Sequence, residues 1–416
     1  MTNRSRYDLY LNTPEFHFVK VAESVLVEED GLLVRFGFRY TPDYLANTSA
    51  FPLDPVRLPL STKEYVLECR LGVPGILDDY LPDDWGRKVL ARLVFYRDQR
   101  ALNSHSCIDT LSVLGESRIG ALQWVAKGQA PNDQSGCDIE KIKLAEKAAQ
   151  SIDQPERYPD QTDELSLLYL ANAGTGVGGA RPKALISDRD KYYLAKFNRL
   201  TQDPYNNARV ELACLEMASL AGLEVFSGHV IEGINGREVL LLKRFDVISD
   251  DKEDYRKHLI TVNALLKEKT NQRDRGGIFR YDDIVQLVRQ HSIEIERDLL
   301  HLLRMMLFNR CINNTDTHER NFSFIHTGEG YRLAPAYDMV PSLVTGQYPV
   351  AGFGYSQQPP LCSEVKTMGK VFGLPKTKVN AVADEVMSAV EAWVDIAQKA
   401  GVSDQDILAI EKRISF

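Results

Sequence analysis

The stretch "NNTDTHERNFSFI", Asn313 to Ile325, places a run of polar and charged residues between two apolar segments. It follows "LLHLLRMMLFNR" (residues 299–310), whose leucines and methionines recur at helical spacing, and it ends in the apolar "FSFI". This pattern predicts a helix packed in a core, then a polar turn, then a short strand. Such a turn is either a solvated loop or a cluster that holds a metal ion and accepts a proton.

The composition limits the classes of protein that the chain can belong to. Its 416 residues suffice for two or three domains or for one large two-lobed body. A hydrophobic content of 44% and a charged content of 26% are typical of a soluble globular protein. The net charge of −8 argues against DNA binding through a broad basic surface, so a role with nucleic acid would need a local patch or a partner.

Cysteine usage and hydropathy predict a cytoplasmic protein. The six cysteines show no metal-ligand or redox spacing and are interpreted as reduced thiols. The N-terminal "MTNRSRYDLYLN" lacks the apolar region of a signal peptide. The longest charge-free run, residues 339–363, contains four prolines and is not a membrane helix. We therefore expect no contact with a membrane.

The order of expected elements predicts an α+β fold with two lobes. The first hundred residues contain short β-type segments, "FHFVKVA", "SVLVEED" and "LLVRFGFRY", followed by a helix over "DDYLPDDWGRKVLARLVFYRD". "KALISD" and "KYYLAKF" (residues 183–188 and 191–197) predict a β-hairpin, and residues 207–222 an amphipathic helix. Beyond residue 247 the chain reads as mostly helical.

The glycine-rich "AGTGVGGARPKALI" (residues 173–186) is the first candidate for chemistry. It contains G-x-G-x-x-G, but a helix precedes it and a hairpin follows, which is the wrong context for a dinucleotide fold. The Walker pattern fails as well, because Ala180 and Arg181 follow Gly179. Kinases cover nucleotide phosphates with a glycine-rich loop beside a hairpin, and Lys183 could add a cation. The alternative is a flexible turn between domains.

Two charged residues follow the loop in an order that fits nucleotide binding. Lys196 lies on the second strand of the expected hairpin, where its ammonium could neutralise the α- and β-phosphates. Glu211, on the next helix, is the natural partner to orient that ammonium. Either residue alone would be interpreted as a surface charge.

The polar turn supplies the remaining groups. Asp316 and Asn321 are five residues apart, the separation at which kinases place the acid that accepts a hydroxyl proton and an amide oxygen for Mg²⁺. Asp338 follows 22 residues after Asp316 and matches the second metal ligand, although Met339 and Val340 replace the usual Phe-Gly. Mg²⁺ prefers such sparse ligation, completed by phosphate oxygens. His318 is either structural or orients phosphate.

These residues together resemble the HipA family of serine/threonine kinases, the toxins of bacterial toxin–antitoxin pairs. The resemblance rests on "LGVPGILDDYLPDDWGR", "GVGGARPKALI", "LLLKRFD", "YDDIVQLVR", "NTDTHERNF" and "YDM", and it covers most of the chain. It implies a kinase-like fold of three parts. These are a β-rich N-terminal subdomain (residues 1–125), the nucleotide-binding part of the N-lobe (126–246) and a helical catalytic C-lobe (247–416).

The resemblance also implies a role for each matching residue. Asp316 corresponds to the catalytic acid, and Asn321 and Asp338 correspond to the Mg²⁺ ligands. Lys196 matches the lysine that contacts ATP. The further positions implied to line the ATP site are Gly178, Gly179, Ala180, Arg181, Pro182 and Lys183 of the phosphate loop, Lys243, Arg244 and Phe245 of the adenine hinge, and His318 and Tyr337 of the cleft.

One departure from the family concerns regulation. The serine that members phosphorylate in the glycine-rich loop aligns with Gly176, and the adjacent Thr175 is the one hydroxyl that could replace it. Thr175 is therefore a possible autophosphorylation site.

The expected activity is ATP- and Mg²⁺-dependent phosphorylation of a protein substrate by a toxin. Members of the family are commonly paired with a small helix-turn-helix antitoxin (HipB-like), so we expect DNA contact to run mainly through that partner. Two alternatives stay open: a small-molecule or lipid kinase of related fold, because Asp-x-His-x-x-Asn also resembles lipid kinases, and a catalytically silent module that binds a repressor.

Overall fold

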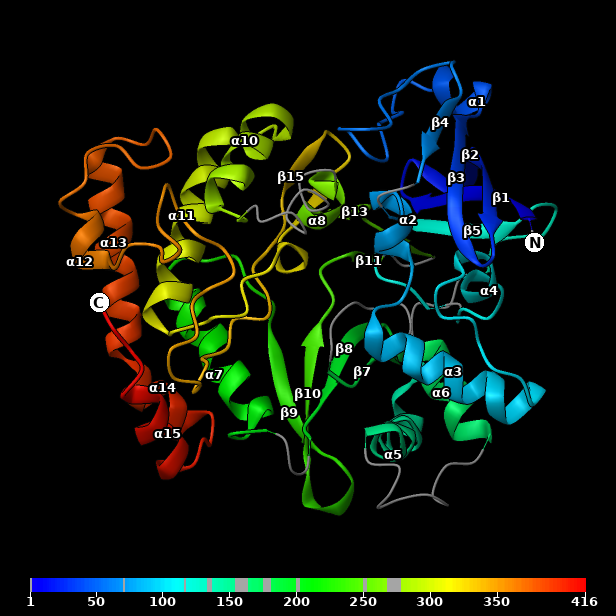
Figure 1. Cartoon of the computed structure of the whole chain (residues 1–416). Coiled ribbons are helices and arrows are strands. Elements are labelled where there is room, and N and C mark those ends of the chain that lie inside the picture. The colour runs from blue at the N-terminus through cyan, green and yellow to red at the C-terminus, as the bar shows by residue number, and fades with distance from the viewer. Residues whose placement is uncertain are drawn as a thin grey trace.

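The computed structural model describes residues 2–69, 72–115, 117–132, 137–153, 164–174, 181–199, 203–249, 253–267 and 278–416. It has the expected α+β architecture, with sheets toward the N-terminus and helices toward the C-terminus (Figure 1). Among the described residues, no helix combines the length and apolar character needed to cross a membrane.

The N-terminal part is an antiparallel sheet with strand order β4-β3-β2-β1-β5. Its strands are β1 (Thr2–Thr13), β2 (Phe16–Glu29), β3 (Leu32–Tyr40), β4 (Tyr65–Glu68) and β5 (Leu122–Ala126), and its helices are α1 (Pro42–Ala46), α2 (Gly75–Tyr80), α3 (Asp84–Asp98) and α4 (Cys107–Ser112).

Two expectations for this part of the chain were wrong in detail. "FHFVKVA" and "SVLVEED" form one continuous strand of 14 residues. The helix expected over residues 78–98 is interrupted at Pro82, whose ring disfavours the helical conformation of the residue before it.

A second sheet, with order β6-β7-β8-β10-β9, forms the N-lobe. Its strands are β6 (Cys137–Asp138), β7 (Lys183–Asp188), β8 (Lys191–Phe197), β9 (Gly228–Glu232) and β10 (Glu238–Lys243), with η1 (Ile139–Lys141), α5 (Ile142–Asp153), α6 (Glu164–Gly174), α7 (Asn207–Leu220) and η2 (Ile234–Gly236). The β7–β8 hairpin is confirmed. One sheet face packs on α5 and α6 in a core that also takes up Trp85, Val89 and Leu93 of α3. α3 therefore joins the N-terminal part to the N-lobe.

The rest of the chain is mainly helical, as expected. Its elements are β11 (Val247–Ser249), β12 (Asp254–Arg256), β13 (Leu259–Thr261), α8 (Val262–Leu265), α10 (Tyr281–His291), α11 (Ile295–Cys311), η3 (Glu319–Asn321), β14 (Ser323–His326), β15 (Tyr331–Leu333), α12 (Cys362–Val365), α13 (Lys376–Glu391), α14 (Trp393–Lys399) and α15 (Asp404–Glu411). α11 lies in the large hydrophobic core and packs on α10 and α13. It carries the polar turn at its C-terminal end.

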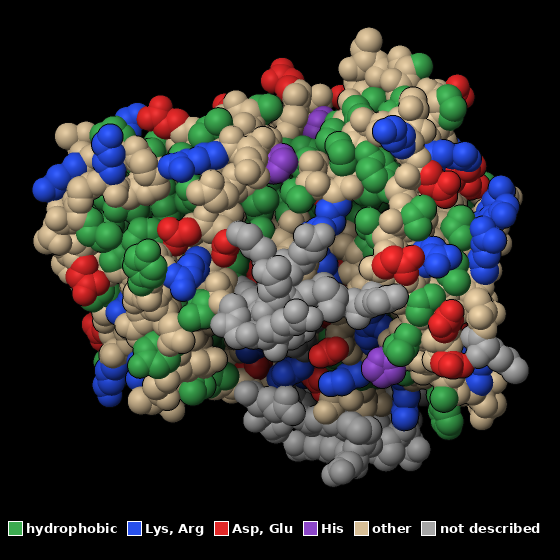
Figure 2. All heavy atoms as spheres, turned by 45° about the horizontal axis from the view of Figure 1, so that its top comes forward, with side chains coloured by type: hydrophobic (Ala, Val, Ile, Leu, Met, Phe, Trp, Pro, Cys, Tyr) green, Lys and Arg blue, Asp and Glu red, His purple; other side chains and the backbone are tan. Residues whose placement is uncertain are grey.

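The face of the molecule seen in Figure 2 carries charged side chains of both signs. Its Lys and Arg side chains lie at several separate places among the described residues, with Asp and Glu side chains near them. This agrees with the net charge of −8.

Candidate active site

Two lysines face the same side of the β7–β8 hairpin. Lys183 and Lys196 are cross-strand partners in the antiparallel register, and partners in such a register project to the same face of a sheet. Lys183 is buried, and the Lys196 side chain is 12% exposed. The hairpin therefore places two cations side by side, where the sequence predicts contacts with phosphate.

Lys196 bridges two carboxylates from different elements. Its Nζ lies 2.5 Å from Oε1 of Glu211 on α7, and it also forms an ion pair with Asp338. Burial by itself lowers the pKa of Lys196, but the two carboxylates outweigh burial and raise it. The contact between Lys196 and Glu211, which the order of elements predicts, is present.

Asp338 is held in the ionised state. Burial by itself raises its pKa, but Lys196 and Lys183 outweigh that effect and keep the pKa well below its ordinary value. Its backbone adopts a left-handed conformation with φ of 55°, which Asp tolerates better than most residues. Burial has the opposite consequence for two neighbours of this pair, since it raises the pKa of Glu211 and lowers the pKa of Lys183.

The polar turn begins where α11 ends. Asn313 adopts a left-handed conformation (φ 55°), a common way for a helix to end. Asn314 then ties the turn together: its Nδ2 donates to Asn309 Oδ1 (3.0 Å) and to the carbonyl of Asp338 (3.3 Å), and its Oδ1 accepts from the N–H of Asp316 (3.0 Å). Asn314 thus fixes Asp316 relative to Asp338, a role that sequence reasoning missed.

Asp316, His318 and Asn321 lie together on this turn. The Asp316 side chain is 71% exposed, so a substrate hydroxyl can approach it, and its Oδ1 lies 3.6 Å from Nε2 of His318. Asn321 Nδ2 donates to the backbone carbonyl of Asp316 (2.5 Å). Within the part of the chain that the structure describes, the hydrogen bonds given for Asp316 use its backbone, and its carboxylate faces His318.

The residues present fit a Mg²⁺ ion that is bound together with a nucleotide. Because the amide nitrogen of Asn321 is engaged with Asp316, the amide oxygen is the end of the side chain that remains for a metal. Asp338 adds one ionised carboxylate. Among the described residues, no group of three His, Cys, Asp or Glu side chains could hold a metal alone. Such sparse ligation suits a cation whose coordination shell is completed by phosphate oxygens.

Tyr337 connects two segments of the candidate site. Its hydroxyl donates to the carbonyl of Arg320 (2.9 Å) and lies 2.6 Å from Oγ of Ser323. Both partners are neighbours of Asn321 in sequence. Tyr337 therefore links the segment of Asp338 to the segment of Asn321.

The backbone of the predicted adenine hinge, Lys243 to Phe245, is partly engaged in hydrogen bonds. The N–H groups of Lys243 and Arg244 donate to the carbonyls of Ser227 and Tyr192 (2.8 Å each). The Arg244 side chain is buried in an ion pair with Asp246 (2.6 Å). These two N–H groups are therefore engaged by neighbouring segments, and contact of Lys243, Arg244 and Phe245 with a base stays a prediction.

An aromatic residue that sequence reasoning missed lies beside the hinge. The Phe226 ring is 4.4 Å from that of Phe245 and 6.4 Å from that of Tyr337, centroid to centroid. Phe226 is part of the short connection before β9, which carried no motif. It places a further aromatic ring beside the predicted hinge.

The glycine-rich loop is described only at its C-terminal end. Thr175, Gly178, Gly179 and Ala180 lie outside the described residues. Arg181 Nη1 forms an ion pair with Asp203 (2.9 Å), and the Pro182 carbonyl accepts from the N–H of Phe197 (3.0 Å). Contact of these residues with phosphate stays a prediction.

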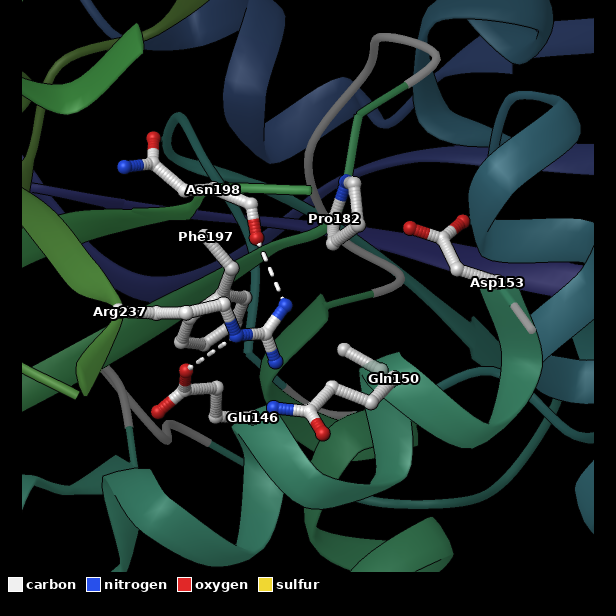
Figure 3. Close-up of a pocket in the computed structure, with 8 residues that line it drawn as sticks. Glu146, Gln150, Asp153, Pro182, Phe197, Asn198 and Arg237 are labelled. Atoms are coloured by element: carbon white, nitrogen blue, oxygen red, sulfur yellow. Dashed lines mark hydrogen bonds and ion pairs between the residues drawn. The ribbon is translucent and has the colours of Figure 1, made fainter. Parts of the chain in front are cut away.

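A pocket in the N-lobe is distinct from this site. Arg237 crosses it, with Nε 3.4 Å from Oε1 of Glu146 and Nη1 donating to the carbonyl of Asn198 (2.9 Å) (Figure 3). Phe197 also lines it. Because Phe197 follows Lys196 on β8, the two side chains project to opposite faces of the sheet. The pocket therefore lies behind the sheet that presents the lysines.

Comparison with protein families gives two matches that together span most of the chain. The HipA-like C-terminal domain matches residues 175–394, and the HipA N-terminal domain matches residues 24–125. The first match includes the residues of the candidate active site described above.

Individual relatives are distant. Y4mE of Sinorhizobium fredii, whose name presents it as an inferred kinase, is 25% identical over 340 residues, which cover 74% of this chain and 72% of Y4mE. The serine/threonine-protein kinase toxin HipA of Shewanella oneidensis is 22% identical over 329 residues (73% of this chain, 70% of that protein).

A solved structure supports the fold over the whole chain. The complex of HipA, HipB and operator DNA from Shewanella oneidensis contains a chain with a TM-score of 0.70 and 18% identity, covering 98% of this chain and 94% of that one. At this identity the likeness shows a shared fold.

Proposed function

Because this chain belongs to the HipA family, we propose that it is an ATP-dependent protein serine/threonine kinase and the toxin of a HipA/HipB-like pair in the cytoplasm. The observation that carries the proposal is the convergence of Lys196, Glu211 and Asp338 beside the turn that bears Asp316. These four residues come from four separate segments of the chain.

In the proposed reaction, a substrate hydroxyl oxygen attacks the γ-phosphorus of ATP. The bond from that phosphorus to the oxygen of the leaving ADP breaks, and the hydroxyl proton passes to Asp316. The exposed carboxylate of Asp316 suits that role. Mg²⁺, when bound, neutralises charge that builds up on the phosphate oxygens.

The lysines bind and orient the nucleotide. Glu211 fixes the Lys196 ammonium at 2.5 Å, so the cation is already placed when phosphate arrives. Lys183 adds a second positive charge beside it on the hairpin. Asn321 and Asp338 would hold the metal, the first through its amide oxygen and the second through its carboxylate. Phe226 and Phe245 would flank the adenine.

We also propose that a small helix-turn-helix antitoxin restrains this kinase and carries most of the DNA contact. The relative solved with HipB and operator DNA supports this, as does the net charge of −8. Co-expression with the product of the neighbouring reading frame, followed by co-purification, tests the partner. A chain that purifies alone under these conditions would contradict it.

The test of the activity uses purified chain, Mg²⁺ and ATP labelled at the γ-phosphate, added to a bacterial lysate. Label on protein, as phosphoserine or phosphothreonine, supports the proposal. Label on a lipid or metabolite favours the related small-molecule kinases, and an absence of transferred label favours a silent binding module.

A further inference from the structure

Arg320 connects the catalytic turn to the N-terminal part of the chain. It belongs to η3 and directly precedes Asn321, yet its side chain reaches α2. Nη2 lies 2.6 Å from Oδ2 of Asp78, and Nη1 lies 3.9 Å from Oδ1 of Asp79. These partners are more than 240 residues away in sequence.

Asp78 is the centre of a compact cluster of charges. Besides Arg320, its Oδ2 accepts from Lys267 Nζ (2.9 Å) and from Asn263 Nδ2 (3.0 Å). Burial by itself raises the pKa of Asp78, but Arg320 and Lys267 outweigh burial and keep the pKa below its ordinary value. The carboxylate is therefore ionised, and the pairing with Arg320 is between full charges.

Asp79 binds β13, which pairs with the strand that follows the turn. Its Oδ2 accepts from the N–H of Thr261 (2.7 Å) and its Oδ1 from the Thr261 hydroxyl (2.6 Å). Thr261 ends β13 and pairs with Ser323 of β14, two residues after Asn321. The two neighbouring carboxylates of α2 thus hold the chain on both sides of Asn321.

The contacts continue to the second candidate metal ligand. The Tyr337 hydroxyl bonds to Ser323 and to the carbonyl of Arg320, and Tyr337 directly precedes Asp338. A continuous path of hydrogen bonds and ion pairs therefore runs from α2 to the segments of both Asn321 and Asp338.

Helix α2 packs closely against α8. Gly75 begins α2, and a Cβ on Gly75 would lie 2.3 Å from the carbonyl oxygen of Ala264 in α8. The backbones of α2 and α8 approach each other at this point, and the approach is possible because glycine has no Cβ. Figure 1 shows α2 between the N-terminal sheet and α8.

We infer that Asp78 and Asp79 are positioning residues, which hold the catalytic turn through Arg320 and Thr261 so that the N-terminal subdomain completes the active site. This inference rests on the proposed function in that the turn is assigned to phosphoryl transfer. Neither carboxylate is a partner of Lys196 or Glu211, so the placement of that ammonium stays intact when the path is broken. The loss should fall mainly on kcat, with a smaller rise in the KM for Mg²⁺·ATP, because the path ends at the segments of the candidate metal ligands Asn321 and Asp338.

The kinetic test compares Asp78→Asn, Asp79→Asn, Arg320→Gln and Arg320→Lys. Residues that orient metal ligands without binding the metal typically contribute roughly 10- to 100-fold to activity. We expect a decrease of this size in the kcat of the first three variants. Arg320→Lys keeps a cation that reaches Asp78 and should recover part of it. The double variant Asp78→Asn/Arg320→Gln should be no slower than the slower single variant, because both changes break one contact.

Asp109→Asn is the matched control. The Asp109 carboxylate also pairs with an arginine, Arg100 (2.9 Å), and it accepts from the N–H of Asn103 in the same N-terminal subdomain. The kcat of Asp109→Asn should equal that of the wild type. Losses of equal size in Asp109→Asn and Asp78→Asn would overturn the inference, since any weakening of the subdomain would then suffice.

A second readout does not need activity. Backbone hydrogen exchange of residues 314–323 should quicken in Asp78→Asn and Asp79→Asn and stay unchanged in Asp109→Asn. If the wild type transfers no phosphate, the proposed function fails, and this exchange alone still decides whether α2 positions the turn. Unchanged exchange in both variants overturns the inference. If either variant does not fold, the kcat and exchange of Arg320→Lys decide in its place.

Discussion

The Lys196 ammonium on β8 forms an ion pair with the Asp338 carboxylate, although the two residues are 142 positions apart in sequence. The pair joins the strand that carries the candidate phosphate-binding lysine to the segment that carries a candidate metal ligand. It also keeps Asp338 ionised, so the carboxylate is ready for a cation before nucleotide binds.

Asp316 and Asp338 should separate catalysis from binding. Asp316→Asn removes the proton acceptor while the backbone bonds that hold the turn remain, so ATP affinity should stay near that of the wild type. Asp338→Asn removes a metal ligand and should weaken the binding of Mg²⁺·ATP. Calorimetric titration checks this, and an equal loss of affinity in both variants would refute the division of roles.

Lys196→Met should weaken ATP binding by roughly 10- to 100-fold, as expected when a charge-assisted contact of about 1.5–3 kcal/mol is lost. Glu211→Gln should have a smaller effect, because Lys196 keeps its pairing with Asp338. Fluorescent-nucleotide titration measures both. Lys191→Met, an exposed lysine on the same strand, is the control, and a loss there as large as in Lys196→Met would contradict a specific role.

Expression of the chain without a partner should arrest bacterial growth if it is a toxin. Asp316→Asn should relieve the arrest at equal protein level, because the proposed toxicity is enzymatic. Growth curves with quantified expression test this. Arrest of the same depth with the variant would point to a mechanism without phosphoryl transfer.

Thr175 is predicted to be the autophosphorylated residue of the glycine-rich loop. A phosphoryl group carries roughly −1.5 to −2 charges at neutral pH and would repel the phosphates of ATP, switching the kinase off. Mass spectrometry after incubation with Mg²⁺ and ATP checks the prediction. An active enzyme whose Thr175 peptide stays unmodified would exclude it.

His258 should make stability depend on pH. Burial lowers its pKa to about 4, while its bond to the carbonyl of Leu53 opposes the shift (2.9 Å). Below the ordinary value of 6.5 the unfolded chain binds a proton that the folded chain does not. The histidine therefore reduces the free energy of unfolding as pH falls from 6.5 to about 4, by up to roughly 1.4 kcal/mol per pH unit.

Urea unfolding of His258→Gln against pH tests this. The stability of the wild type relative to the variant should fall over that interval, whereas the exposed His105→Gln should run parallel to the wild type. Parallel curves for His258→Gln would contradict the prediction. Asp54 has the opposite effect, because burial raises its pKa to about 6, but it is common to all three proteins.

The sequence predicted the elements of the cleft better than the contacts between them. The order of hairpin, Lys196, Glu211 and polar turn was legible because each element has a local pattern. The role of Asn314 and the ion pair of Arg320 with Asp78 were not predicted, since both depend on how distant segments pack. For the same reason Cys311 and Cys362, 51 residues apart, gave no signal although their sulfurs lie 3.5 Å apart in the core.

The most direct test of the account is the rate at which purified chain transfers the γ-phosphoryl group of ATP to a protein hydroxyl in the presence of Mg²⁺. The wild type should transfer it, and Asp316→Asn should be slower by roughly 10²- to 10⁴-fold, the usual contribution of a general base. Asp109→Asn should match the wild type. Transfer by Asp316→Asn at the rate of the wild type would contradict the assignment of this cleft as the catalytic centre.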